Sequence, residues 1–327
     1  MKKNFSILIS GAGQIGSRYL QGLISVNVPL RIFVQDVSIN ALKMSESRWR
    51  EVNGDKSIHR TSFDINFTDL PRKIDLCILA TTADVRPSIL KEITKKTFVN
   101  YWILEKVLCQ NNDGLGIILQ ETKNASGVWV NMSRRVIPFH KQICKAIGNV
   151  KKLEAKVIGP NWGLACNSLH FIDYIAHITK EKPIKIQTSL LEKYWIKSKR
   201  ENFWEVLGTL QIYFSGGTEL SLDASLDELN TGLRHHSFLI RNTNSEITWD
   251  INEAKGVAIS SDGNRIKSKL LFQSDITKTL VESILDTGKC ELTILEESCE
   301  MHELFFEKIL EHWRYHEDPM ALSVPIT

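Results

Sequence analysis

A glycine-rich hexapeptide, GAGQIG, occupies residues 11–16 and directly follows an apolar run, FSILIS, at residues 5–10. A short apolar run of this kind is typical of a buried parallel strand. In residues 17–24 the apolar side chains recur at helical spacing. The hexapeptide therefore stands between a predicted strand and a predicted helix, which is the context expected for a G-x-G-x-x-G phosphate-binding turn.

Each glycine of this motif has a separate physical role. Gly11 permits the tight turn, Gly13 lets the backbone approach a pyrophosphate, and Gly16 lets helix and strand pack closely. Amide groups at the helix N-terminus then face the phosphates. We predict a dinucleotide-binding turn formed by Gly11, Gly13, Gln14, Ile15 and Gly16. A glycine-rich turn without a ligand is the alternative.

Asp36 closes the second predicted strand, which begins at Leu30, and lies 20 residues after Gly16. A carboxylate there accepts hydrogen bonds from the adenosine ribose and repels a 2′-phosphate. No arginine stands among the three residues that follow it. These features predict NAD rather than NADP as cofactor. An aspartate that only caps the next helix is the alternative.

Strand and helix patterns alternate from residue 5 to residue 132. This alternation is typical of right-handed βαβ crossovers and a doubly wound parallel sheet. We therefore predict an α/β Rossmann domain over residues 1–133, which binds NAD.

The pattern changes after about residue 150. Seven strand-like stretches follow one another between residues 151 and 260, joined by turn signals such as SGG and SDGN. Two helical patterns, near residues 276–285 and 292–316, close the chain. We predict a C-terminal α+β domain over residues 134–327, with a mainly antiparallel sheet that supplies the substrate site and the oligomer interface.

Charge and hydropathy exclude several classes of protein. The 41 basic and 38 acidic residues leave a formal charge of only +3, which gives no electrostatic footprint for nucleic acid. No stretch approaches the ~20 apolar residues of a membrane helix. The six cysteines are scattered, without a C-x-x-C pair, which favours reduced thiols and a cytoplasmic location.

Five motifs in order resemble the glucose–fructose oxidoreductase and inositol dehydrogenase family, often called Gfo/Idh/MocA. The resemblance covers essentially the whole chain. The motifs are GAGQIG (11–16), LATTAD (79–84), LEKVL (104–108), NMSRRVIP (131–138) and NSLHFIDY (167–174). The first is shared by many Rossmann proteins, whereas the ordered set is much more specific. It implies that Thr81 and Glu105 contribute to the cofactor site.

Lys106 stands in the stretch Glu105-Lys106-Val107, where the family has Glu-Lys-Pro. The resemblance implies that Lys106 is catalytic, beside the nicotinamide, where its charge stabilises a developing alkoxide. Val107 departs from the family's proline, whose fixed φ helps to position the lysine. An ordinary Glu-Lys pair at a strand end is the alternative.

His170 is the second implied catalytic residue and shares a helix face with Asp173. In the family an aspartate often stands four residues before this histidine, but here that position is Cys166. Without the carboxylate an imidazolium is less stabilised, so we expect His170 to be a weaker base than in the typical member. A buried core histidine is the alternative.

Four further residues are predicted to bind the substrate. Arg135 lies in SRRVIP, which resembles the family's Arg-x-x-Pro segment, and the resemblance implies that it borders the active-site cleft. Arginine and asparagine suit a polyhydroxy compound, and a tryptophan offers a flat wall to a sugar ring, with simple packing as the alternative. The four residues are Arg135, Trp162, Asn167 and Asp173. The pocket composition fits a sugar, a sugar acid or a nucleotide-sugar and does not choose among them. We expect no metal site, although His312 and His316 have helical spacing that suits zinc, because no third ligand is evident.

These features together predict an NAD-dependent oxidoreductase that transfers hydride from a carbinol carbon of a carbohydrate-like substrate. A non-catalytic NAD-binding regulator or scaffold of the same fold is the alternative, motivated by Val107 and Cys166. We also expect a homodimer or homotetramer, because the alternating strands of the C-terminal domain would otherwise expose a large apolar sheet face.

Overall fold

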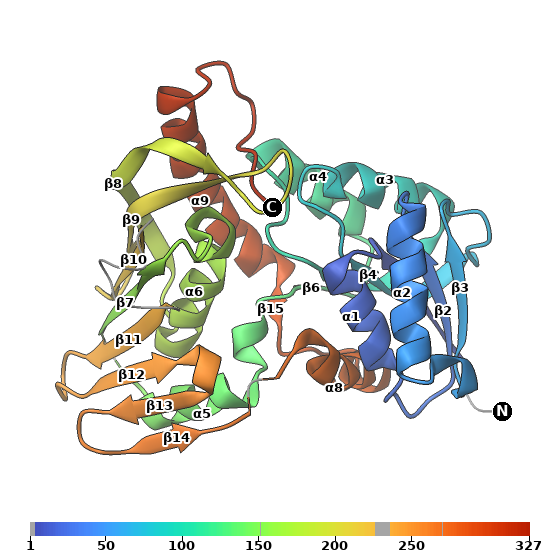
Figure 1. Ribbon diagram of the computed structural model, residues 1–327, viewed down its shortest axis with the longest axis horizontal. Helices are drawn as coiled ribbons and strands as arrows, with labels where there is room; N and C mark the ends of the chain where they lie inside the picture. The colour runs from blue at the N-terminus through green and yellow to red at the C-terminus, as the bar shows by residue number, and fades with distance from the viewer. Residues whose placement is uncertain (1–3, 151, 226–235, 270) are drawn as a thin grey trace. The chain divides into compact units, whose positions relative to one another are not determined.

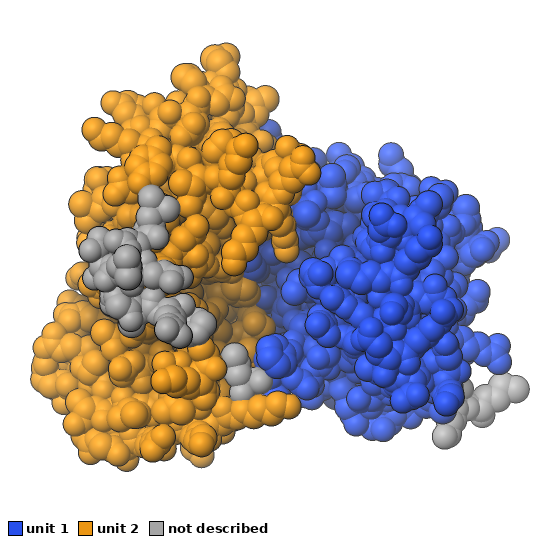
Figure 2. Space-filling model, in the orientation of Figure 1, with its two compact units in different colours: residues 1–109, 113–131, 271–296 blue, residues 110–112, 132–270, 297–327 orange. Residues whose placement is uncertain are grey.

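The computed structural model describes residues 4–150, 152–225, 236–269 and 271–327; Lys151, at the start of the predicted C-terminal strands, lies outside them. The chain divides into two compact units (Figure 2). Unit 1 consists of residues 1–109, 113–131 and 271–296, and unit 2 of residues 110–112, 132–270 and 297–327.

Unit 1 contains a sheet of seven strands. They are β1 Phe5–Ser10, β2 Leu30–Gln35, β3 Arg60–Asp64, β4 Lys73–Leu79, β5 Phe98–Leu104, β6 Gly127–Val130 and β15 Thr293–Ile294. Their order is β15-β6-β5-β4-β1-β2-β3 (Figure 1). All pairs are parallel except β15 with β6. The centre of β1, residues 7–9, is fully buried, as expected for a parallel strand covered on both faces.

The helices of this unit connect and cover the strands. They are α1 Gln14–Leu23, α2 Ile39–Glu51, α3 Arg86–Lys96, α4 Asn112–Thr122 and α8 Gln273–Thr287, together with the 3₁₀ turn η1 Gly54–Lys56. Helix α1 packs against α2 and α8. The predicted doubly wound parallel sheet is confirmed.

Helix α8 marks a difference from the predicted domain limits. The segment 271–296 falls within the predicted C-terminal domain, whereas in the structure it belongs to unit 1. Its contact with α1 depends on Gly22, because a Cβ there would lie 2.5 Å from the carbonyl oxygen of Ser274 and 2.6 Å from the Cβ of Thr277. Such a long-range contact leaves no local signal in the sequence.

Unit 2 contains a sheet of eight described strands. They are β7 Leu153–Pro160, β8 Pro183–Lys197, β9 Trp204–Phe214, β10 Glu219–Ser225, β11 Ser237–Asn242, β12 Thr248–Asn252, β13 Val257–Ser260 and β14 Arg265–Lys267. Their order is β14-β13-β12-β11-β7-β10-β9-β8, and only β7 with β10 is a parallel pair. The predicted mainly antiparallel sheet is confirmed.

Three helices and two 3₁₀ turns complete the described part of unit 2. They are α5 Pro138–Ile147, α6 Leu164–Thr179, α9 Leu295–His316, η2 Ser133–Arg135 and η3 Glu253–Lys255; α9 begins in unit 1 and continues in unit 2 from residue 297. Helix α6 lies across one face of the sheet and contacts β9 and β10 (Figure 1). Helix α5 and strand β14 were not expected from the sequence patterns.

The other face of this sheet is polar, which differs from the apolar face expected from the sequence. Glu154 and Lys156 of β7 are exposed, while their neighbours Leu153, Ala155 and Val157 are buried. Because successive side chains of a strand point to opposite faces, the apolar residues of β7 face the core and its charged residues face solvent. The neighbouring β11 contributes an exposed arginine that pairs with Glu154 at 2.9 Å. Within the described residues, no helix is long and apolar enough to cross a membrane.

Candidate active site

The glycine turn of unit 1 contains two glycines that the packing requires. Gly11 has φ +93°, and a Cβ there would lie 2.6 Å from the carbonyl carbon of Ala80 and 2.6 Å from the nitrogen of Thr81. A Cβ on Gly16 would lie 1.8 Å from the carbonyl oxygen of Gly11. Both positions therefore exclude any side chain, because β1, α1 and the end of β4 meet here.

Gly13 differs from these two. A Cβ on Gly13 would meet no atom within 4 Å, and its φ of −66° is ordinary for any residue. It is the N-cap of α1, where no side chain caps the helix. Gln14 is exposed and accepts a hydrogen bond from Arg48, and Ile15 is half-buried. Packing within the described part of the protein therefore does not explain why this position is a glycine.

Asp36 lies directly after β2 and is half-buried. Its Oδ2 accepts a hydrogen bond from the nitrogen of Ala12 at 2.7 Å, and its Oδ1 accepts one from the nitrogen of Ser38 at 2.8 Å. The N-cap of α2 is Ser38, whose side chain accepts from Ala41. Asp36 therefore ties the glycine turn to the end of β2 rather than capping α2, and each of its oxygens retains a lone pair.

Thr81 and Glu105 lie just after β4 and β5. The hydroxyl oxygen of Thr81 is buried without a hydrogen-bond partner among the described residues. Glu105 is 9% exposed, and its Oε1 accepts hydrogen bonds from the hydroxyl of Tyr19 at 2.8 Å and from Nδ2 of Asn131 at 2.7 Å. Burial, together with the adjacent Glu105 carboxylate, raises the pKa of Tyr19 well above its usual value.

Lys106 is half-buried at the carboxyl end of β5, and the peptide bond between Lys106 and Val107 is cis. The carbonyl oxygen of Val107 accepts a hydrogen bond from the guanidinium of Arg86, which also donates to the carbonyl oxygen of Thr81. Arg86 is only 1% exposed. This arginine, which the sequence motifs did not identify, therefore links the loops after β4 and β5.

These features of unit 1 fit a dinucleotide. The bare backbone at Gly13 and the uncapped N-terminus of α1 suit a pyrophosphate. The buried Thr81 hydroxyl supplies a polar atom that the described protein leaves unpaired, at the same carboxyl edge of the sheet. Asp36 lies at the end of β2, where a ribose is expected.

In unit 2, two of the predicted substrate residues pair with each other. Arg135 forms a two-point ion pair with Asp173, with Nε–Oδ2 and Nη2–Oδ1 distances of 2.9 and 2.8 Å. Asp173 is fully buried, and Arg135 also contacts Glu297 at 3.2 Å. His170 is half-buried on the same helix, α6. The charge of Asp173 is thus balanced inside the unit by Arg135.

The other two predicted substrate residues, Trp162 and Asn167, lie close together at the N-terminus of α6. Asn167 donates from Nδ2 to the carbonyl oxygen of Trp162 at 2.9 Å, and the Trp162 indole donates to the carbonyl oxygen of Asp223 at 2.7 Å.

Cys166 donates its thiol to the carbonyl oxygen of Thr327. Glu205 of β9 accepts hydrogen bonds from the nitrogens of Ala165 and Cys166, at 2.8 and 3.3 Å. Glu205 therefore caps this helix from a neighbouring strand.

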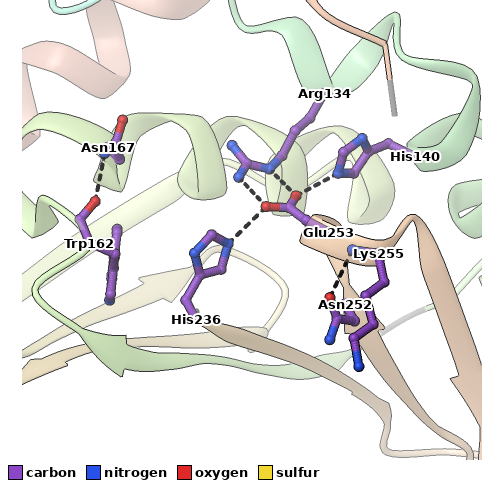
Figure 3. A network of polar contacts seen from close by, with 8 residues as sticks. All are labelled: Arg134, His140, Trp162, Asn167, His236, Asn252, Glu253 and Lys255. Atoms are coloured by element: carbon purple, nitrogen blue, oxygen red, sulfur yellow. Dashed lines mark hydrogen bonds and ion pairs between the residues drawn. The ribbon is translucent and has the colours of Figure 1, made fainter. Parts of the chain in front are cut away.

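A buried charge cluster is centred on Glu253 of η3 (Figure 3). Arg134 binds both of its oxygens at 2.8 Å, Nε of His140 lies 2.6 Å from Oε1, and Nε of His236 lies 2.9 Å from Oε2. The Arg134 guanidinium also stacks over the ring of Phe171, 3.9 Å from its centroid. Four separate segments thus meet at one carboxylate.

The electrostatics of this Glu253 cluster follow from burial and pairing. Burial opposes ionisation of Glu253, but Arg134 and the two histidines outweigh it and hold the pKa of Glu253 well below its usual value. Burial lowers the pKa of His140, although its hydrogen bond to Glu253 opposes the shift. The surroundings therefore favour the charged form of Glu253 and the neutral form of His140.

Sequence patterns missed the Glu253 cluster, because its members come from η2, α5, η3 and the residue before β11. The motif NMSRRVIP includes Arg134, but the predicted role fell on its neighbour Arg135. His312 and His316 have ring centroids 4.5 Å apart, and Trp195 donates to Nδ1 of His312. Among the described residues, no group of three or more metal-binding side chains was found.

Comparison with known proteins gives matches among solved structures. UDP-N-acetylglucosamine 3-dehydrogenase GnnA from Acidithiobacillus ferrooxidans matches with a TM-score of 0.67 at 11% identity, over 94% of this chain and 97% of that one. Myo-inositol 2-dehydrogenase from Lactobacillus plantarum matches with a TM-score of 0.65 at 15% identity, over 95% and 97%. The chain has the fold of the Gfo/Idh/MocA-type dehydrogenases.

An oxidoreductase from Agrobacterium radiobacter, solved with NAD⁺, L-tartaric acid and magnesium, matches with a TM-score of 0.69 at 13% identity, over 94% and 97% of the two chains. No family model matches the sequence, and no curated protein matches it. The resemblance seen in the sequence motifs is therefore confirmed for the fold, which this chain shares with these two dehydrogenases and this oxidoreductase.

Proposed function

We propose that this protein is an NAD-dependent dehydrogenase that oxidises a hydroxyl group of a sugar, sugar acid or nucleotide-sugar. The observation that carries the proposal is Gly13, a glycine of the phosphate-binding motif that internal packing does not require. The hydroxyl of Thr81, which has no hydrogen-bond partner in the part of the chain that the structure describes, and the carboxylate of Asp36 support the same ligand. The shared fold with dehydrogenases of this type adds to the case.

Asp36 favours NAD over NADP, because its negative charge repels a 2′-phosphate and the next residues supply no arginine. When bound, NAD would supply the acceptor for a hydride from the carbinol carbon of the substrate. By its resemblance to the family, Lys106 stabilises the negative charge that develops on the reacting oxygen, and His170 is the group that takes the proton. Trp162, Asn167, Arg135 and Asp173 are the residues assigned to the sugar; Asn167 and Asp173 share helix α6, and Arg135 pairs with Asp173.

A non-catalytic regulator that binds NAD is the second candidate. Cys166 stands in place of the family's aspartate and its thiol donates to a backbone carbonyl, while the carboxylate of Asp173 is paired with Arg135. The helix that carries His170 thus has no carboxylate at position 166 to support a base. Both candidates bind NAD, and only turnover separates them.

The test has two stages. Titration of the purified protein with NAD(H) and NADP(H), followed by intrinsic fluorescence, should give tighter binding of NAD(H), and equal or tighter binding of NADP(H) would refute the cofactor assignment. Absorbance of NADH then reports turnover with a panel that includes UDP-N-acetylglucosamine, myo-inositol and L-tartrate. Turnover of a panel member supports the dehydrogenase, whereas NAD binding without turnover across a wide panel favours the regulator.

We also propose a cytoplasmic homodimer or homotetramer that associates through the open face of the unit 2 sheet. That face carries Glu154, Lys156 and Arg241, so charge pairs rather than apolar burial would determine the contact. Such an interface weakens as salt rises. Sedimentation at micromolar concentration should detect the oligomer at low salt, and a monomer there would refute it.

A further inference from the structure

The carboxylate of Glu105 is held at only one of its two oxygens. Its Oε1 accepts hydrogen bonds from the hydroxyl of Tyr19 at 2.8 Å and from Nδ2 of Asn131 at 2.7 Å. Among the residues that the structure describes, none donates a hydrogen bond to Oε2. A carboxylate oxygen is a strong acceptor, because hydrogen bonds to a charged group are shorter and stronger than neutral ones. Oε2 can therefore accept a hydrogen bond from a ligand.

The two donors that hold Oε1 are themselves fixed by burial. Tyr19 is fully buried, and Asn131 is 5% exposed. Burial raises the pKa of Tyr19 well above its usual value, so the hydroxyl stays protonated at neutral pH and acts as a donor. Nδ2 of Asn131 also donates to Oε1 of Gln273 on α8, at 2.8 Å. These residues all belong to unit 1, and together they restrict the rotation of the Glu105 carboxylate.

The order of the strands indicates which part of a dinucleotide Glu105 would meet. Strands β2, β1, β4 and β5 are neighbours, and they are followed in that order by Asp36, the glycine turn, Thr81 and Glu105. Dinucleotides bind along this carboxyl edge, where the strand order reverses. With the adenosine ribose at Asp36 and the pyrophosphate at the glycine turn, the second nucleoside is expected at the ends of β4 and β5. Glu105 lies two strand spacings from the glycine turn, which is about 10 Å.

We propose that Oε2 of Glu105 accepts a hydrogen bond from the nicotinamide nucleoside of the cofactor, and that Tyr19 and Asn131 are the positioning residues that fix the carboxylate in this orientation. This inference rests on the NAD binding proposed above. The nicotinamide nucleoside carries two kinds of donor, the ribose hydroxyls and the N–H groups of the carboxamide. Both match a carboxylate oxygen, which only accepts.

Glu105→Gln tests the orientation directly. An amide has one accepting end and one donating end. Because Tyr19 and Asn131 both donate, they hold the amide oxygen at the position of Oε1 and leave the NH₂ group at the position of Oε2. The variant therefore presents a donor to the donors of the nicotinamide nucleoside. We expect the NAD affinity of the full-length protein to fall by at least about tenfold, because a hydrogen bond to a charged group is lost.

Calorimetric titration with three ligands of increasing length measures where the loss occurs. ADP lacks the nicotinamide nucleoside, so its affinity for Glu105→Gln should stay close to that for the wild type. ADP-ribose adds the ribose without the nicotinamide. A loss of affinity that includes ADP-ribose identifies a ribose hydroxyl as the donor, whereas a loss confined to NAD identifies the carboxamide, and either result supports the proposal. Equal losses for ADP and NAD would mean that Glu105 has only a structural role, which would overturn the proposal.

Tyr19→Phe should have opposite effects in two backgrounds. In the wild type it removes one donor that holds the carboxylate, so NAD affinity should fall by about fivefold, as for one ordinary hydrogen bond. In Glu105→Gln the same change lets the amide turn its oxygen toward the ligand more readily, so NAD affinity should rise relative to Glu105→Gln alone. Asn131→Leu, which removes the second donor, should show the same reversal. A defect in folding would instead weaken NAD binding in both backgrounds and would refute the positioning role.

Tyr174→Phe is the matched control for Tyr19→Phe. It also removes a buried phenol hydroxyl, which donates to the carbonyl oxygen of His140 at 2.8 Å, but it lies in unit 2. Its NAD affinity should equal that of its parent in both backgrounds. A loss as large as that of Tyr19→Phe would show that removal of any buried hydroxyl weakens binding, and would overturn the assignment of Tyr19.

The outcomes separate this inference from the proposed function. If the wild-type protein binds ADP and NAD, and Glu105→Gln binds NAD equally well, the dinucleotide site stands and the role of Glu105 with its two positioning residues is refuted. If the wild-type protein binds neither ADP nor NAD, the cofactor assignment itself fails, and this inference fails with it.

Discussion

The glycine turn of unit 1 and the Glu253 cluster of unit 2 place functional groups in opposite ways. The turn is contiguous in sequence, over residues 11–16, and is tied to Asp36 by one hydrogen bond. The cluster joins residues far apart, and Arg134 is 119 positions from Glu253. A spacing motif therefore reveals the first, whereas only tertiary packing reveals the second.

The two regions also differ in what they leave open. At Gly13 the functional feature is an absence of side chain, which exposes backbone. At Glu253 every acceptor position is filled, and the feature left open is the exposed ring of His236. A substitution at Gly13 is therefore expected to cost little stability and to weaken cofactor binding, whereas separating the charges of the Glu253 cluster is expected to lower the stability of unit 2.

Gly11→Ala should have the largest effect. An alanine at φ +93° with its Cβ 2.6 Å from backbone atoms is strained and cannot be relieved by rotating a side chain. We expect the free energy of unfolding to fall by more than about 4 kcal/mol, which is in the range of the most damaging substitutions. Urea denaturation followed by circular dichroism measures it.

Gly13→Ala is the matched comparison for that variant. Since a Cβ at Gly13 meets no atom within 4 Å, we expect a loss of about 1 kcal/mol, as for a weakened N-cap, together with at least a tenfold loss of NAD affinity. If Gly13→Ala bound NAD as the wild type does, the open space would not be the pyrophosphate site.

Glu253→Gln should destabilise unit 2 by about 3–5 kcal/mol at pH 7, because Arg134 loses its buried counter-charge. The pKa of Glu253 in the folded chain is well below its ordinary value near 4.5. The carboxylate therefore contributes its full stability above pH 4.5 and loses it as the pH falls through the folded value. Urea midpoints at successive pH values should show wild type and variant converging on acidification. A gap that did not narrow with falling pH would contradict this.

The glycine turn could be predicted from the sequence and the Glu253 cluster could not, and the reason is physical. Local periodicity and the glycine spacing predicted the parallel sheet, the phosphate-binding turn and the position of Asp36, because each depends on near neighbours. The position of α8 in unit 1 depends on a contact between Gly22 and Thr277, which no local pattern encodes. The same holds for Glu253, which lies in a short 3₁₀ turn without a motif.

The N-terminus of α6 gives a similar lesson. The sequence showed that Cys166 replaces the family's carboxylate. It did not predict that Glu205, which is distant in sequence, caps the same helix. Arg135 and Asp173 were predicted to face the substrate, and their two-point pairing became evident only when the helix and η2 were placed together.

Lys106→Met should lower turnover by about 10²–10³ while NAD binding persists, because the methionine keeps the length of the side chain and removes the charge at the reacting oxygen. His170→Asn should cost less, since position 166 supplies no carboxylate to support the imidazolium. The order of these two effects, measured as kcat on the same substrate, is the informative quantity. Near-normal turnover in Lys106→Met would place the catalytic site elsewhere.

Asp36→Asn should change stability as little as Gly13→Ala does, and it tests the one side chain that serves both folding and cofactor choice. Its two oxygens accept hydrogen bonds from Ala12 and Ser38, and an asparagine oxygen can keep only one of them, so we expect a loss of about 1 kcal/mol in stability. Removing the negative charge abolishes the repulsion of a 2′-phosphate, so the preference for NAD(H) over NADP(H) should fall by about tenfold, which corresponds to about 1.4 kcal/mol. Titration of both cofactors on both proteins measures the ratio. An unchanged ratio with the expected loss of stability would mean that Asp36 acts only as the tie between β2 and the glycine turn.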